Sequence, residues 1–377
     1  MKQSFAEILQ QVERRGQLKL EAKIPSWAGA GTIAVPSALN LEQCSSEDAA
    51  MLKAELVGPC GSLADLTGGL GVDSWAFSKV ARKVLHIERN EELSAAAASN
   101  FSKLGISNIE TLCATTDATL VEGLPSFDWI YIDPARRDNA GRKVFLLEDC
   151  TPDVLTLLPF IWKKTSSVMI KLSPMADISL IARKLGQELE KVYVVCLGGE
   201  VKELLCILHK GHTGGYGIGV RLLAAECPAL EFLPEDEENA EAVHDGIPQE
   251  GQYINEPCAG LLKAGAFRLP CTLWGLRKMD RSTHLYLSDG PLPASARPWF
   301  RSYRILRAEV MGAAAIKDIA KAFPRADVSA RNIPMTSEQL RAKLKCAPST
   351  DGTHIFGCSG SGKRWLVICR ADTSSRI

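Results

Sequence analysis

A short glycine-rich stretch constrains the fold of this chain more than any other part of its sequence. Residues Leu63–Ser74 read Leu-Ala-Asp-Leu-Thr-Gly-Gly-Leu-Gly-Val-Asp-Ser. This pattern predicts the end of a buried strand, a turn containing Gly68, Gly69 and Gly71, and the start of a helix over about Val72–Val80. Glycine lets a ligand approach the backbone where a side chain would collide, and the helix start presents free N–H groups. The stretch therefore predicts a cofactor-binding turn.

Two acidic residues near this turn indicate the kind of cofactor. Asp65 ends the first strand, and Glu88 ends the second strand 23 residues later. An acid at the tip of the second strand is placed to accept hydrogen bonds from ribose hydroxyls. The turn lacks the Gly-x-Gly-x-x-Gly spacing of dinucleotide sites, and Asp65 would repel a pyrophosphate. The segment resembles that of class I methyltransferases, whose cofactor, S-adenosylmethionine, carries no phosphate.

The composition is that of a globular protein with full hydrophobic cores. Of its 377 residues, 46% are hydrophobic and 23% are charged, and the length allows two or three domains. Lys+Arg and Asp+Glu both number 44, so the charge of the whole chain does not favour a polyanionic partner. The twelve cysteines show no zinc-binding spacing. Because there is no signal peptide or apolar run of ~20 residues, we expect a cytoplasmic protein, with no metal site and no membrane contact.

Strands and helices alternate between Ser62 and Leu208, which predicts a mostly parallel sheet covered on both faces. Helices are expected over Glu91–Leu104 and Ile178–Leu189. The seven expected strands are Ser62–Leu66, Lys83–Glu88, Ile109–Leu112, Trp129–Ile132, Ser167–Leu172, Lys191–Leu197 and Leu204–Leu208. This arrangement fits the Rossmann-like α/β sheet of class I methyltransferases, which we expect over residues 59–212.

The regions on either side of the sheet follow other patterns. Residues 1–58 are expected to form a helical cap, with one helix over Lys2–Gly16 and another, capped by Ser45 or Ser46, that continues through Leu56. Beyond residue 212 the pattern is that of an α+β region.

Three segments of this C-terminal region have readable patterns. Pro234–Asn239 is predicted to be an acidic loop, and Tyr253–Phe267 to be a loop that leads into a helix. Residues 357–363, Gly-Cys-Ser-Gly-Ser-Gly-Lys, have the spacing of a P-loop, but Arg364 replaces the Ser or Thr that binds magnesium. We interpret this stretch as the turn of a hairpin.

The fourth strand is followed by Asp-Pro-Ala-Arg, at the edge where doubly wound sheets carry their reactive groups. Asp133 and Pro134 resemble the Asp/Asn-Pro-Pro-aromatic motif of methyltransferases that act on exocyclic amines. There the acid or amide accepts hydrogen bonds from the target nitrogen and aligns its lone pair for attack on the methyl group. This chain has Ala135 and Arg136 in place of the second proline and the aromatic residue. Arg136 could stack on a base, contact a phosphate or pair with nearby acids.

Further candidates lie around the same edge of the sheet. Asp117 follows the third strand, either where an acid meets the adenine amino group in class I methyltransferases or as a helix N-cap. Lys171 is expected to have a structural or phosphate-binding role. Gln43 and Ser46 are secondary candidates because a polar helix start in cap-guanine methyltransferases is similarly placed. The segment Ile170–Met175 contains no cysteine, so methylation of pyrimidine C5 is not expected.

Motifs spread over the whole chain resemble a bacterial family of class I methyltransferases with a C-terminal THUMP-like domain. The resemblance rests on Asp65–Asp73, Asp133–Arg137, Lys171–Pro174, Gly199–Glu203, Asn255–Pro257, Leu262–Phe267, His284–Tyr286, Ala330–Pro334 and Glu338–Leu344. It implies a linker and ferredoxin-like module over residues 213–297, a THUMP-like domain over 298–377, and structured RNA as substrate. The cofactor segment is similar to that of ribosomal RNA guanine-N2 methyltransferases.

The sequence thus predicts an S-adenosylmethionine-dependent methyltransferase that acts on a base amine, guanine N2 favoured, in structured RNA such as tRNA or rRNA. The expected catalytic residues are Asp133, Pro134 and Arg136. The expected cofactor-binding residues are Asp65, Thr67, Gly68, Gly69, Gly71, Glu88 and Asp117. Two alternatives stay open: a methyltransferase of a small molecule or protein whose C-terminal modules dimerise, and an RNA-binding protein without catalysis. The oligomeric state is also left open.

Overall fold

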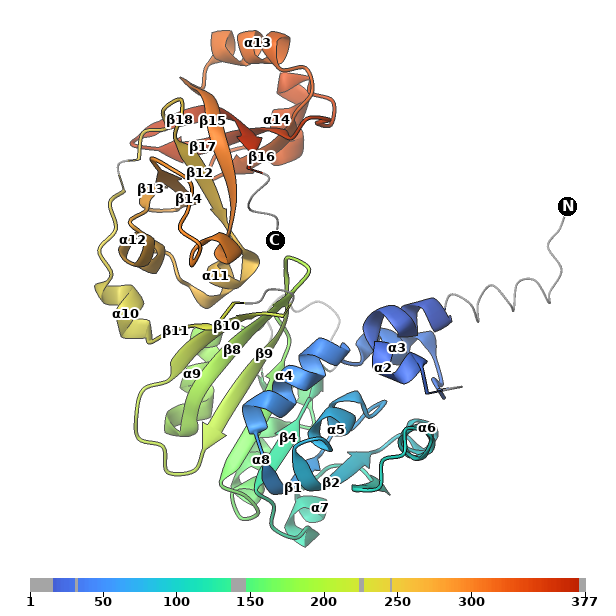
Figure 1. Cartoon of the computed structure of the whole chain (residues 1–377). Helices are drawn as coiled ribbons and strands as arrows, with labels where there is room; N and C mark the ends of the chain where they lie inside the picture. Colours follow the sequence, from blue (N-terminus) through green and yellow to red (C-terminus); the bar gives the residue numbers. More distant parts are fainter. Residues whose placement is uncertain (1–15, 31–32, 137–146, 224–226, 245, 373–377) are drawn as a thin grey trace, which may run out of the picture. The chain divides into compact units, whose positions relative to one another are not determined.

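The chain forms two units, which are described separately (Figure 1). The computed structural model describes residues 16–30, 33–136, 147–223, 227–244 and 246–372. The first unit comprises residues 1–195 and 202–216, and the second comprises 196–201 and 217–377. The helix predicted over Lys2–Gly16 lies outside the described residues except for its last one. In the described part of the chain, no helix combines the length and the apolar character that a membrane crossing requires.

The first unit is built on a mostly parallel sheet. Its seven strands are β1 (Cys60–Asp65), β2 (Ala81–Glu88), β3 (Ile109–Cys113), β4 (Trp129–Ile132), β7 (Ser167–Leu172), β8 (Leu189–Leu197) and β9 (Glu200–His209). They lie in the order β8-β9-β7-β4-β1-β2-β3, with β7, β4, β1, β2 and β3 parallel and β9 antiparallel to β7. The predicted α/β fold is confirmed, and all seven predicted strands are present. The sheet is larger than predicted, because β10 (Gly217–Leu222) and β11 (Leu230–Phe232) also belong to it and bring it to nine strands among the described residues.

The order of these strands determines where a ligand can bind. From β1 the chain moves outward through β2 and β3, and then returns to the other side of β1 as β4. The direction of winding therefore reverses between β1 and β4. Open α/β sheets bind their ligands at this point, beyond the carboxyl ends of the strands. Residues 65–71 and 133–134 follow these two strands, so both motifs meet at the switch point.

Among its described residues, the first unit has five α-helices after the glycine turn, and all but the first of them, α5, are capped by side chains at their starts. They are α5 (Val72–Phe77), α6 (Glu91–Lys103), α7 (Ala118–Gly123), α8 (Val154–Ile161) and α9 (Ile178–Leu185). Asn90 caps α6 by accepting from the backbone N–H of Leu93 at 2.9 Å, and Asp177 caps α9 in the same way. Two of these helices are shorter than predicted, since α5 ends at Phe77 and α9 gives way to a 3-10 turn over Gly186–Glu188.

Within the described residues, 16–23 are helical, and three further helices lie between them and the sheet: α2 (Pro25–Ala28), α3 (Ala38–Gln43) and α4 (Glu47–Val57). Of the two predicted capping residues, Ser46 caps α4 by accepting from the Ala49 N–H at 3.4 Å. Trp27, which is fully buried, packs edge-on against Trp75 of α5 with a ring-centroid distance of 6.1 Å. This aromatic contact fixes the N-terminal helices against the helix that follows the glycine turn.

The second unit has an α+β fold around a seven-stranded sheet in the order β13-β14-β12-β15-β18-β17-β16. Its strands are β10 (Gly217–Leu222), β11 (Leu230–Phe232), β12 (Tyr253–Pro257), β13 (Arg277–Asp280), β14 (Thr283–Ser288), β15 (Phe300–Val310), β16 (Asp327–Arg331), β17 (Thr353–Gly360) and β18 (Lys363–Ala371). Of these, β10 and β11 pair antiparallel with each other and belong to the large, nine-stranded sheet. Its helices are α10 (Pro234–Asn239), α11 (Ala259–Ala264), α12 (Leu269–Trp274), α13 (Ala313–Ala322) and α14 (Ser337–Leu344). Side chains of β17 alternate between two hydrophobic cores, with Phe356 in one and Ile355 in the other.

Two predictions in the second unit are wrong. Residues 234–239, predicted as a loop, form α10: Pro234 supplies the φ of a first helical turn, and Asp236 accepts from the Leu233 N–H at 2.7 Å. Residues 253–257, also predicted as a loop, form β12, which lies between β14 and β15. The predicted hairpin is confirmed, since the P-loop-like stretch ends β17 and Lys363 begins β18.

Candidate active site

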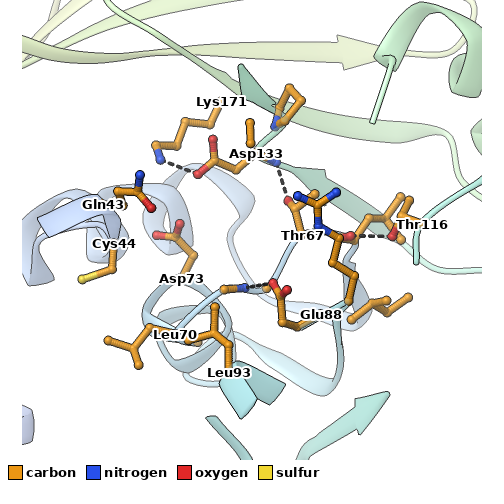
Figure 2. A pocket seen from close by; sticks show the side chains of 18 of the residues that line it. Gln43, Cys44, Thr67, Leu70, Asp73, Glu88, Leu93, Thr116, Asp133 and Lys171 are labelled. Carbon is orange, nitrogen blue, oxygen red and sulfur yellow. Dashed lines mark hydrogen bonds and ion pairs between the residues drawn. The ribbon is translucent and has the colours of Figure 1, made fainter. Parts of the chain in front are cut away.

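A pocket of about 760 Å³ lies at the carboxyl ends of β1, β2, β4 and β7 (Figure 2). The glycine turn, the ends of these strands and the end of α3 line it. Of the predicted residues, the pocket is lined by Thr67, Gly68, Gly69, Gly71, Glu88, Asp133 and Pro134. The structure therefore brings most of the predicted site residues to one place.

The three glycines of the turn are needed for two different reasons. Gly69 and Gly71 have φ angles of 56° and 91°, in the left-handed region that side chains disfavour. Gly68 lies against the ring of His86, and a Cβ at this position would be 2.1 Å from the ring carbon Cε1. The turn can therefore adopt this shape only with these glycines.

The Glu88 carboxylate is held at the edge of the turn by two backbone groups. Its Oε2 accepts from the Gly69 N–H at 2.9 Å, and its Oε1 accepts from the Asn90 N–H at 2.8 Å. Both oxygens retain further acceptor capacity, because a carboxylate offers about four lone-pair positions. Glu88 is thus oriented to accept hydrogen bonds from a pair of hydroxyl groups.

The hydroxyl groups of two threonines form hydrogen bonds between the loops of the pocket. Thr67 Oγ1 accepts from the Asp133 N–H at 2.6 Å, which links the turn after β1 to the loop after β4. Thr116 Oγ1 donates to the Leu66 carbonyl at 2.6 Å, which links the loop after β3 to the same turn (Figure 2). The three loops therefore form one hydrogen-bonded rim.

Asp65 lies beneath the turn and does not line the pocket. It is fully buried, and its carboxylate accepts from Ser74 Oγ at 2.6 Å and from the Thr67 N–H at 3.1 Å. Burial raises the pKa of Asp65 to about 7 and lowers that of His86 to about 4. Because Ser74 gives its proton to Asp65, it accepts from Nδ1–H of a neutral His86 at 2.9 Å. The observed role of Asp65 is to support the turn, and its contact with a cofactor stays a prediction.

Asp133 follows β4, and its carboxylate faces the pocket (Figure 2). The side chain is 33% exposed, and its Oδ2 forms a close ion pair with the ammonium of Lys171 from β7. Pro134 is buried next to it. Arg136 belongs to the short strand β5 (Ala135–Arg136), which pairs with β6 (Cys150–Thr151), but its side chain is outside the described part of the structure. The predicted role of Arg136 is therefore not tested.

The remaining candidates take different positions. Asp117 is exposed, caps α7 by accepting from the Leu120 N–H at 2.8 Å, and is not among the residues that line the pocket. Gln43 lines the pocket, whereas Ser46 only caps α4. Cys44 also lines the pocket, but burial raises the pKa of its thiol and so disfavours the thiolate. A nucleophilic role in C5 methylation is therefore not favoured.

Sequence reasoning missed a buried charge cluster beside the pocket. Asp73 lines the pocket, and its Oδ2 accepts from Ser45 Oγ and from Tyr131 Oη, both at 2.9 Å. Its Oδ1 lies 3.1 Å from the ammonium of Lys53, which also forms an ion pair with Glu203 at 2.9 Å. Lys53 is fully buried in α4, and Glu203 is buried in β9. No sequence signal links these three residues.

Comparison with known proteins identifies the family. Residues 253–294 match a ferredoxin-like domain, and residues 300–371 match a THUMP-like domain. The chain is 30% identical to a candidate methyltransferase from Porphyromonas gingivalis W83, with a TM-score of 0.82 over 94% of this chain and 88% of the other. The chain belongs to this family of class I methyltransferases. Its cofactor is S-adenosylmethionine.

Two further solved structures are much less similar. A candidate methyltransferase from Streptococcus mutans in complex with S-adenosylhomocysteine is 14% identical, with a TM-score of 0.32 over 42% of this chain and 96% of the other. An rRNA methylase from Streptococcus thermophilus is 15% identical, with a TM-score of 0.32 over 47% of this chain and 99% of the other. Among curated proteins no significant match is found.

The pocket of this methyltransferase fits its cofactor. Its volume, about 760 Å³, lies within the range of about 300–1,000 Å³ that is usual for ligands of this size. Glu88 offers the acceptors that a ribose needs, and the carboxylate of Asp73 provides negative charge for a sulfonium. The residues present are therefore suited to a nucleoside that carries a positive charge and no phosphate.

Proposed function

We propose that this methyltransferase transfers the methyl group of S-adenosylmethionine to a base amine in structured RNA, with guanine N2 the favoured acceptor. The observation that carries the proposal is the carboxylate of Asp133 at the end of β4, inside the pocket and beside the switch point. Among the described residues, its Oδ1 has no hydrogen-bond partner, while Oδ2 is paired with Lys171. A free carboxylate oxygen suits an amine, which donates N–H groups.

The proposal assigns separate roles to the residues of the pocket. Glu88 binds the ribose hydroxyls, and the turn of Thr67, Gly68, Gly69 and Gly71 accommodates the rest of the cofactor. Asp133 accepts a hydrogen bond from the target amine, which points the nitrogen lone pair at the methyl group. Pro134 shapes the loop. Arg136 contacts the substrate, Asp65 acts from beneath the turn, and Asp117 contacts the adenine.

An RNA substrate is supported by the C-terminal half of the chain. The ferredoxin-like and THUMP-like domains lie in the second unit, and the THUMP relationship favours structured RNA such as tRNA or rRNA. The name of the similar rRNA methylase from Streptococcus thermophilus fits the same substrate class. We place the enzyme in the cytoplasm, which the twelve free cysteines support. The rival proposal is a small-molecule or protein substrate, with the second unit used for dimerisation.

The test is methyl transfer from labelled S-adenosylmethionine to total RNA from a strain that lacks the gene, followed by digestion to nucleosides. We expect label in N2-methylguanosine with the wild-type enzyme and none with Asp133→Ala. The control is Glu122→Ala, which changes an acid that is 58% exposed on the first unit and outside the pocket, and it should leave activity unchanged. Cofactor binding by Asp133→Ala should stay near the wild-type level.

Four outcomes contradict the proposal in different ways. Label in another nucleoside rejects guanine N2, and label in ribose rejects the amine. An absence of label in RNA, with the cofactor still bound, rejects RNA as the substrate. Loss of cofactor binding in Asp133→Ala would reject the role given to this residue.

A further inference from the structure

We propose that Lys171 is a positioning residue, which binds one oxygen of the Asp133 carboxylate and thereby directs the other toward the acceptor amine. The inference rests on the proposed function, because it gives Asp133 the role of amine acceptor. It adds a role for a lysine that pairs with Asp133 and for the buried charges behind it. Lys171 would act through Asp133 and would not itself touch the reacting atoms.

The sheet places the two side chains next to each other. Strands β4 and β7 are parallel neighbours, and Ile132 is paired in register with Ile170. The residues that follow these two along the chain are Asp133 and Lys171, so the backbone of the lysine lies directly beside that of the aspartate. The Lys171 side chain is only 16% exposed, and its ammonium meets Oδ2 of Asp133. A single lysine rotamer can therefore hold this oxygen throughout the reaction.

Asp133 is fixed at two points, which leaves one free direction. Its backbone N–H donates to Thr67 Oγ1 at 2.6 Å, and its Oδ2 is held by Lys171. Of the two carboxylate oxygens of Asp133, Oδ1 has no hydrogen-bond partner among the described residues and keeps its full acceptor capacity (Figure 2). A carboxylate restrained in this way has lost the rotations that would otherwise spread its oxygens over several orientations.

The buried cluster keeps Lys171 in its charged form. Burial by itself would lower the pKa of Lys171, but the carboxylates of Asp133, Glu203 and Asp73 raise it above its ordinary value. Lys53 is held between Asp73 and Glu203, and its own pKa is raised by these two acids in spite of burial. Lys171 is therefore an ammonium at neutral pH and cannot serve as the base that takes a proton from the substrate.

The charges of the cluster suit the reaction. When all are ionised, two lysines, Lys53 and Lys171, face three carboxylates, Asp73, Asp133 and Glu203, which leaves one net negative charge. The cofactor brings one positive charge on its sulfonium. This charge moves to the acceptor nitrogen as the methyl group is transferred, so the negative site remains matched to it.

The step balances as follows. The lone pair of the amine forms the new N–C bond while the S–C bond breaks, and its electron pair stays on sulfur to give neutral S-adenosylhomocysteine. The methylated nitrogen, now positive, loses a proton to Oδ1 of Asp133, which passes it to solvent. Lys171 keeps its three protons throughout, so its contribution is orientation alone.

The test compares Lys171→Met with Lys171→Arg in the full-length enzyme. Because an error of about 1 Å in the position of a catalytic group costs about 100-fold in rate, we expect Lys171→Met to lower kcat by about 10–100-fold. The KM for RNA and the dissociation constant of the cofactor should change by less than about threefold, since the proposal gives Lys171, although it lines the pocket, no binding contact with either ligand. Lys171→Arg should recover most of the loss, because a guanidinium also pairs with a carboxylate.

A control and a second pair of variants separate positioning from other roles. Lys163→Met is the control: Lys163 pairs with Glu122 on the surface, both side chains being more than half exposed, and its loss should leave kcat unchanged. In the Asp133→Asn background, Lys171→Met should have little further effect on kcat, because its partner carboxylate is already gone. This comparison is informative even if Lys171→Met alone is poorly folded.

Two results would overturn the inference. If Lys171→Met raises the KM for RNA, leaves kcat unchanged and weakens the salt dependence of RNA binding, Lys171 contacts a phosphate. If the losses from Asp133→Asn and Lys171→Met simply multiply, Lys171 does not act through Asp133. Label on a nucleoside other than N2-methylguanosine would refute the proposed acceptor, while the same kinetic comparison on that product would still decide the role of Lys171.

Discussion

Replacing Lys53 with methionine should destabilise the first unit strongly. The Lys53 ammonium is fully buried and lies 3.1 Å from Asp73 Oδ1, 2.9 Å from Glu203 Oε1 and 3.0 Å from Ser45 Oγ. Methionine has a similar length and fills the same space. The substitution removes the ammonium of Lys53. Among the described residues, this is the only positive charge at ion-pair distance from Glu203 and the closest one to Asp73.

The size of this effect follows from the burial of the pair. Removing one partner of a buried ion pair costs about 3–5 kcal/mol, because the other charge is left without compensation. Domains of ordinary stability unfold with about 5–15 kcal/mol, so this is a large fraction of the total. In a unit of this size, 1 kcal/mol lowers the melting temperature by about 2–4 °C. We therefore expect Lys53→Met to melt roughly 6–20 °C below the wild-type unit.

The assay is scanning calorimetry with and without S-adenosylmethionine. The cofactor stabilises only the unit that binds it, so the transition that it raises belongs to the first unit. Lys19→Met is the matched control, because Lys19 pairs with Glu42 at 2.7 Å but the two side chains are 56% and 58% exposed. A surface pair of this kind contributes about 0–1 kcal/mol.

A second variant tests the cause of the destabilisation. In Lys53→Met/Glu203→Gln, one of the two abandoned carboxylates is neutral, so part of the lost stability should return. The reasoning is refuted if Lys53→Met melts no lower than Lys19→Met, or if the double variant melts lower than Lys53→Met.

Three further predictions concern the cofactor turn. Gly68→Ala should weaken cofactor binding in calorimetric titrations, because its Cβ would lie 2.1 Å from the His86 ring, whereas Gly29→Ala, with open space around it, should bind normally. Because the folded-state pKa of Asp65 is about 7, above its ordinary value of 3.8, the stability that this carboxyl contributes is present at low pH and is lost as the pH rises toward 7. Asp65→Asn should therefore gain melting temperature relative to wild type between pH 5 and pH 8, and a difference that does not change with pH would contradict this. Glu88→Gln should weaken cofactor binding on the order of 10–100-fold, and an unchanged affinity would remove Glu88 from the ribose site.

The sequence predicted those parts of the site that lie next to strand ends. Thr67, Glu88 and Asp133 each follow or end a strand with a readable apolar run, and parallel strands bring their carboxyl ends to one edge. Lys53 and Glu203 could not be found in this way. They are 150 residues apart, in a helix and a strand that each contain several charged residues, so the sequence does not single out these two.

The two wrong predictions in the second unit also have physical causes. Strand β12, predicted as a loop, contains the polar residue Asn255. This residue is buried, and it accepts from Ser302 Oγ at 2.7 Å and donates to Ser288 Oγ at 3.1 Å. Side chains of the neighbouring strands thus supply the hydrogen bonds of the Asn255 amide, a polar group that is usually exposed. Helix α10 is acidic throughout, yet its acids fall mostly in the first turn, where the helix dipole favours them.

The hydrogen bond between the Asp133 N–H and Thr67 Oγ1 has a consequence for inhibitor design. It connects the cofactor turn to the loop after β4, so a shift of the Thr67 hydroxyl also shifts the backbone of Asp133. A cofactor analogue that pushes on Thr67 would therefore misalign the acceptor side without reaching it. The effect of such a compound on methyl transfer would depend on the hydrogen bond between Thr67 and Asp133.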